Sequence, residues 1–124
     1  MTDKSAELAG TLVAEHRSGT NFHRLEGIND LADAYNVQEK YIAAIRDGDE
    51  TAGYKIGLTS KRMQDMCGID QPIHGTIFKR RVAFTGAHLA HADYHRLGLE
   101  FEICVRLGQD LLPSDVPFTP ETAG

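Results

Sequence analysis

Two glutamates separated by one residue are the first side chains in this sequence whose spacing could do chemistry. Glu100 and Glu102 lie in the segment LGLEFEICVRLG, in which every second residue from 99 to 105 is apolar. On a strand, side chains two residues apart face the same side, with Cα atoms roughly 6.5 to 7 Å apart. Such a pair could share one hard cation, because these ions prefer carboxylate oxygens. A half-exposed strand with two solvated glutamates is the competing interpretation.

A lysine and an aspartate in the preceding 50 residues are further candidates. Lys55 lies between Gly53 and Gly57, whose missing side chains would let a ligand or another backbone approach. It could bind a carboxylate or exchange a proton, although lysines on strands are usually simply exposed. Asp70, in GIDQP, could take part in the same chemistry or serve only to form a turn.

Three histidines offer a competing metal site. His88, His91 and His95 lie in HLAHADYH, but no helix pattern there places their rings on one face, and zinc demands fixed geometry. We therefore favour the glutamate pair. Nucleophilic triads, a phosphate-binding loop and a glycine-rich dinucleotide turn are not found in the sequence.

Periodicity predicts the elements that must position these residues. Amphipathic helices are expected over 5–17 and from about residue 30 to the glycine at 48, followed by a strand over 53–59. A short helix should run from Ser60 to Gly68, and IDQPIHGTIF, with its proline and glycine, is expected to be a loop. Further strands are predicted over 81–84 and 99–107. Thr119, Pro120 and Glu121 are typical of a helix start.

Composition excludes several protein classes. The chain has 124 residues, 41% of them hydrophobic and 25% charged, which predicts one folded domain. A net charge of -5 disfavours a nucleic-acid partner, and the basic run Lys79–Arg81 is interpreted as a solvated turn. Cys67 and Cys104 stand alone, which indicates reduced thiols and a cytoplasmic protein. The sequence has neither a signal peptide nor a run of about 18 apolar residues, so we expect neither secretion nor membrane insertion.

Four segments in a fixed order resemble a known family. They are AYNVQ, GYKIGLTSKRMQ, GIDQPIHGTIF and GLEFEICVRLGQDL. Together they resemble the 2-keto-4-pentenoate hydratases and the related 2-oxo-3-hexenedioate decarboxylases of the fumarylacetoacetate hydrolase superfamily, and they correspond to the N-terminal portion of that family. The resemblance implies an α+β fold with a helical region over 1–50 and the first part of a mixed β-roll, with catalytic residues, over 51–124.

The resemblance also implies roles for individual residues. Glu100 and Glu102 match two ligands of a magnesium or manganese ion, and Lys55 matches a lysine beside the substrate. Leu58 belongs to the same substrate-binding segment. Asp70 matches an acidic residue that assists binding or proton transfer. The family's third carboxylate ligand falls in a stretch that follows the point where this sequence ends, so we expect a truncated site.

The implied activity is that of a lyase in aromatic meta-cleavage catabolism, which adds water to a 2-hydroxydienoate or 2-oxo-4-enoate. The metal would stabilise the enolate of a 2-oxo acid, and the same electron sink would serve decarboxylation of 2-oxo-3-hexenedioate. A catalytically silent fragment that acts only through association is the third possibility. We expect the chain alone to be inactive, to expose apolar surface and to form homo-oligomers.

Overall fold

Two long helices open the fold. The computed structural model describes residues 3–94, 97–113 and 116–123. Helix α1 spans Lys4–Ser18 and helix α2 spans Leu31–Ile45, and they pack against each other. Asp30 caps α2 through the backbone N–H of Asp33. The helix ends at Arg46 as its C-cap, two residues before the glycine that the sequence suggested.

A two-stranded antiparallel sheet follows. Strand β1 spans Thr51–Gly57 and strand β2 spans Ile73–Phe78, with Lys55 opposite Gly75. Helix α3, Lys61–Cys67, connects them, and Ser60 and Gly68 cap it as predicted. The expectation that IDQPIHGTIF is a loop is wrong over β2. Its proline precedes the strand and its glycine lies opposite a long side chain, so neither prevents pairing.

Side chains of α2 attach that helix to the free edge of β2. The backbone N–H of His74 donates to the Tyr35 hydroxyl at 3.0 Å, and the Gln38 amide donates to the His74 carbonyl at 3.2 Å. The rings of Tyr35 and His74 stack with centroids 4.6 Å apart. Both edge groups of this β2 residue are therefore satisfied by a helix instead of a third strand.

The other end of α2 is attached through Arg80. Its guanidinium donates to the carbonyls of Ile45 and Arg46, both at 2.8 Å, and pairs with Asp49 at 3.0 Å. These carbonyls end the helix without an intrahelical partner, so the contact caps them. The same guanidinium lies 4.5 Å from the ring centroid of Phe78, one of the few buried side chains.

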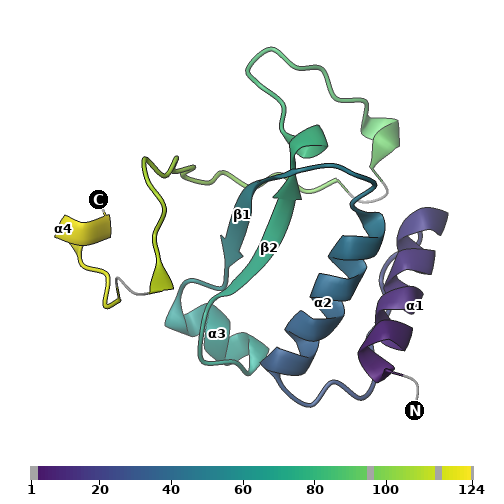
Figure 1. Cartoon of the computed structure of the whole chain (residues 1–124). Helices are drawn as coiled ribbons and strands as arrows, with labels where there is room; N and C mark the ends of the chain where they lie inside the picture. Colours follow the sequence, from purple (N-terminus) through teal and green to yellow (C-terminus); the bar gives the residue numbers. More distant parts are fainter. Residues whose placement is uncertain (1–2, 95–96, 114–115, 124) are drawn as a thin grey trace.

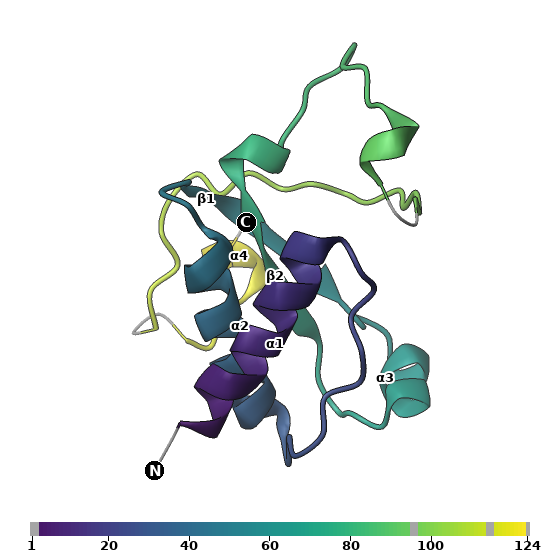
Figure 2. The ribbon, with the colours of Figure 1, turned by 90° about the vertical axis from the view of Figure 1, so that its right-hand side faces the viewer.

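The small core lies between the two long helices and where α2 meets β2. Its buried apolar residues are Ala9, Val37, Ile45 and Phe78. Figure 1 shows α2 between α1 and the sheet, and in Figure 2, turned by 90°, α1 lies in front of the sheet. The two long helices thus lie together on the β2 side of the sheet.

The predicted strands after β2 do not form. A single-turn 3-10 helix spans Lys79–Arg81, so the basic run is an exposed turn as expected, and residues 82–84 are irregular. Residues 97–107 also lack regular structure. A second 3-10 turn spans His91–Asp93, and α4 spans Pro120–Ala123, where a helix start was predicted. Strands at these positions would need a pairing edge, and within the described ranges β1 and β2 pair only with each other.

The helices and the antiparallel pair together give an α+β fold, as the sequence predicted. Within the described residues, no helix has both the length and the apolar character required to cross a membrane.

The attachment of α2 to β2 predicts the effect of a one-atom change. Tyr35→Phe removes the hydroxyl that accepts from His74 N–H, and we expect the free energy of unfolding to fall by about 1 kcal/mol. Urea titration followed by circular dichroism measures this loss. Tyr54→Phe is the matched control, since the Tyr54 hydroxyl has no hydrogen bond in the described part of the chain. Equal losses in both variants would contradict the attachment.

Candidate functional site

Lys55 brings the two predicted glutamates together. It lies in the middle of β1, and its ammonium group is 3.0 Å from Oε2 of Glu100 and in direct contact with Oε1 of Glu102. The two carboxylates therefore lie on the same side of their segment although that segment is not a strand. Three of the residues singled out in the sequence form one cluster, and their catalytic and metal-binding roles stay predictions.

The cluster is open to water. The side chains of Lys55, Glu100 and Glu102 are 47%, 69% and 57% exposed, so the ion pairs are screened and salt-sensitive. Hydrogen bonds to Glu102 and then Glu100 raise the pKa of Lys55 above its ordinary value. A raised pKa means that the ion pairs contribute fully below pH 10.5, the ordinary lysine pKa, and are lost as the pH rises through the higher folded-state value.

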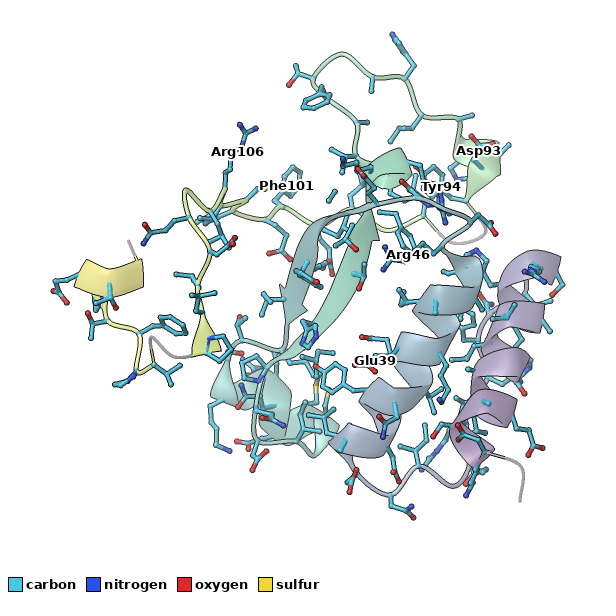
Figure 3. All side chains as sticks on the ribbon, in the orientation of Figure 1. Glu39, Arg46, Asp93, Tyr94, Phe101 and Arg106 are labelled. Carbon is cyan, nitrogen blue, oxygen red and sulfur yellow. The ribbon has the colours of Figure 1, made fainter. Side chains whose placement is uncertain are left out.

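These ion pairs attach an otherwise irregular segment to the sheet. Figure 3 labels Phe101 and Arg106 on this segment, which runs on the side of the sheet away from Glu39 and the long helices. Phe101 is 99% exposed and Ile103 is 94% exposed, so the apolar side chains between and after the glutamates add no packing. Electrostatic attraction to Lys55 is accordingly the main described link between residues 100–102 and β1.

Leu58, the predicted substrate-binding residue, directly follows β1 and has an uncommon backbone conformation. Its φ is 53°, in the left-handed region that costs a residue with a Cβ about 1–2 kcal/mol. The buried side chain of Gln64 donates to the Leu58 carbonyl at 2.8 Å and so holds this turn from α3. Sequence reasoning did not single out Gln64, because nothing in the helix pattern marks a buried amide. Substrate binding by Leu58 stays a prediction.

Asp70 lies apart from the cluster. It is exposed in the loop between α3 and β2, and it lines a shallow hollow with Asp30, Leu31 and the residues around them at the start of α2. In the described part of the chain it makes no hydrogen bond or ion pair with Lys55 or either glutamate. The structure therefore does not bring Asp70 to Lys55 and the two glutamates.

The structure gives no support to the alternative metal site of three histidines. His91 begins a 3-10 turn, His88 is exposed in the preceding loop, and His95 lies outside the described residues. Among residues 3–94, 97–113 and 116–123, no group of three or more histidine, cysteine, aspartate or glutamate side chains is placed to hold a metal ion. The site offers two carboxylates.

The two carboxylates suit a hard divalent cation in chemistry and in position. Both already reach a single positive charge, the Lys55 ammonium, so they can reach a metal ion at a similar place. Magnesium and manganese favour oxygen donors and keep several waters, but two carboxylates alone bind them weakly. The donor set therefore fits part of such a site.

Comparison with known proteins supports the resemblance read from the sequence. The chain is 33% identical over 111 residues to 2-keto-4-pentenoate hydratase 1 of Dechloromonas aromatica, which is 89% of this chain and 42% of that protein. It is 36% identical over 110 residues to hydratase 2 of the same organism, and 39% identical over 88 residues to the TodF product hydratase of Pseudomonas putida. The last match covers 70% of this chain and 33% of that protein.

The chain spans less than half the length of these relatives. No family model matches it. The matches to these relatives confirm the similarity to the hydratases for most of the chain. More than half of each relative lies outside the match.

The cluster predicts that Lys55 restrains the segment carrying the glutamates. In Lys55→Met the two carboxylates lose their shared cation, so we expect trypsin to cut after Arg106 roughly two- to fivefold faster. Lys61→Met is the control, because Lys61 makes an exposed ion pair with Asp65 inside α3 and its loss also removes one tryptic site. Mass spectrometry of the digests gives the rates. Unchanged cleavage in Lys55→Met would mean that the ion pairs do not hold the segment.

Proposed function

Because the chain is related in sequence to the 2-keto-4-pentenoate hydratases, we propose that it carries part of the active site of a divalent-metal-dependent hydratase. The substrate class is a 2-hydroxydienoate or its 2-oxo-4-enoate tautomer, and the reaction adds water to the conjugated double bond. The observation that carries the proposal is the convergence of Glu100 and Glu102 on Lys55. The names of the relatives support a hydratase role.

Glu100 and Glu102 are proposed to hold magnesium or manganese. When bound, such an ion supplies a Lewis acid that stabilises the enolate of a 2-oxo acid. Two carboxylates leave most of the coordination to water, substrate and donors from elsewhere, so tight binding requires further ligands. We propose that these come from the remainder of a mixed β-roll of the fumarylacetoacetate hydrolase type.

Lys55 is proposed to act on the substrate once a cation takes its place between the glutamates. The ammonium and a divalent ion would compete for the same carboxylate oxygens, so Lys55 would be free of the glutamates if an ion were bound there. A freed ammonium near a dication can anchor the substrate carboxylate. It can also exchange a proton, because the neighbouring positive charge lowers the pKa of an amine. In this arrangement the same residue keeps the two carboxylates together before the metal arrives.

Metal binding by the chain alone tests the ligands directly. We expect weak binding of Mn²⁺, measured by electron paramagnetic resonance of the free ion, and a loss of about tenfold or more in affinity in Glu100→Gln or Glu102→Gln. Glu39→Gln is the control with the same change of charge, since Glu39 is exposed on α2 and forms no ion pair in the described residues. An equal loss of Mn²⁺ affinity in this control would show that only net charge matters, and it would reject Glu100 and Glu102 as metal ligands.

A chimera tests the reaction. The chain would replace the matched 111 residues of D. aromatica hydratase 1, and loss of dienoate absorbance with Mg²⁺ would report hydration. We expect activity in the chimera, a fall in kcat/KM of about 100-fold or more in Glu100→Gln, Glu102→Gln or Lys55→Met, and little change in Glu39→Gln. The chain alone should give no turnover. A folded chimera that binds Mn²⁺ without hydrating the dienoate would overturn the proposed reaction.

A further inference from the structure

The ends of α1, α2 and β2 surround a hollow that the proposed hydratase chemistry does not use. All three elements end toward the same side of the molecule (Figure 1). The hollow is open and has a volume of about 620 Å³, within the range of roughly 300 to 1,000 Å³ that is typical of small-molecule sites. We call it the basic hollow, and its lining consists of residues 45 and 47–49 together with His16, Arg17, Arg80 and Arg81.

Two arginines of the basic hollow have no partner. Arg17 and Arg81 are exposed, and they form no hydrogen bond or ion pair within the part of the chain that the structure describes. Arg80, in contrast, is paired with Asp49, which leaves the carboxylate of Asp47 as the other free charge of the lining. Two guanidinium groups against one carboxylate give the hollow a positive balance in a chain whose net charge is -5.

Basic residues near the C-terminal ends of helices often serve only to oppose the negative end of the helix dipole. In this structure other groups already bind the terminal carbonyls. The backbone N–H of Gly19 closes α1, and the guanidinium of Arg80 donates to the carbonyls that end α2. Neither Arg17 nor Arg81 donates to these carbonyls, so both guanidinium groups are free to bind a ligand.

A tyrosine of α2 links His16 and Arg81 at the basic hollow. The Tyr41 hydroxyl lies 3.0 Å from Nδ1 of His16, and the two rings meet edge to face. Burial raises the pKa of Tyr41, and the positive charge of Arg81 opposes that rise, so Arg81 acts on the same hydroxyl. When Tyr41 donates to Nδ1, a neutral His16 ring carries its proton on Nε2 and can donate it to a ligand.

We propose that the basic hollow binds a small anion through a carboxylate or phosphate group, with Arg17 and Arg81 as its cationic partners. A guanidinium presents paired N–H donors that match the oxygens of either group. The volume of the hollow and the negative charge of the whole chain favour a small molecule over an extended polyanion. The hollow shares no residue with the cluster around Lys55, so the proposal does not depend on the hydratase function.

Titration with two simple anions tests the site. Inorganic phosphate and malonate are added separately to the chain, and NMR follows the Nε–H signals of its arginines. We expect saturable shifts of the Arg17 and Arg81 signals with a Kd of roughly 0.1 to 10 mM at low ionic strength. Saturation by phosphate identifies a phosphate group as the ligand, saturation by malonate identifies a carboxylate, and saturation by both supports a site that accepts either.

A double substitution tests the two cationic partners. Arg17→Met with Arg81→Met should weaken anion binding by at least about tenfold, because each removes a charged donor. Arg62→Met with Arg106→Met is the matched control, since these arginines are also exposed and have no ion pair in the described residues. Both double variants lose the same charge, and circular dichroism checks that both keep the fold.

Asp47 provides a substitution with the opposite effect. Its carboxylate belongs to the lining, and its φ of 50° lies in the left-handed region that asparagine also adopts. Asp47→Asn therefore removes a repelling charge without adding backbone strain, and we expect anion affinity to rise about two- to fivefold. Glu39→Gln makes the same change of charge on α2 outside the lining, and it should alter the affinity less.

Three results would overturn the proposal. The first is that neither anion shifts the Arg17 and Arg81 signals beyond the effect of sodium chloride at equal ionic strength. The second is that the two double variants weaken binding equally, which would show that only net charge matters. The third is that Asp47→Asn gives no larger gain in affinity than Glu39→Gln, which would place the bound anion outside the basic hollow.

Discussion

The sheet of this chain depends on what α2 supplies to the outer edge of β2. Two antiparallel strands are marginal in water, because each has only one partner and one set of unpaired backbone groups. Tyr35 and Gln38 satisfy both backbone groups of His74, and the ring of Tyr35 stacks on the His74 ring. With this edge fixed and Arg80 capping the end of α2, the register that places Lys55 opposite Gly75 is held from both ends.

The two edges of the sheet are consequently unequal. The edge of β2 at His74 is bonded to a helix, whereas β1 faces a segment whose main link to it, among the described residues, is the ion pairs of Lys55. Buried side chains that pack together fix one geometry and exclude water, but exposed ion pairs between long side chains tolerate many geometries. In this cluster Lys55 comes from a paired strand, whereas Glu100 and Glu102 come from a loosely attached segment. This difference would matter for the proposed metal binding, because magnesium requires near-ideal octahedral geometry.

Sequence reasoning succeeded where the signals were local. The helices over 4–18, 31–45 and 61–67 follow from apolar spacing and from caps such as Asp30 and Ser60, which act within one turn. It failed where the outcome depended on distant partners. Strand β2 was missed because its turn-forming residues outweighed a pairing with β1 that no local window contains. The strand over 99–107 was predicted from a sound alternation, but a strand also needs an edge to pair with.

The same division applies to the candidate site. The alternation of residues 99–105 predicted Glu100 and Glu102 on one face of a strand; the strand does not form, but both carboxylates contact Lys55. Both glutamates are 45 or more residues from Lys55 in the sequence, and opposite charge brings them to it. Asp70 was predicted by a similar sequence argument, yet its loop lies beside the start of α2, away from the cluster. The lysine is thus the residue around which the site is organised. A cation on a strand can hold two carboxylates at one place in a chain whose packing there is incomplete.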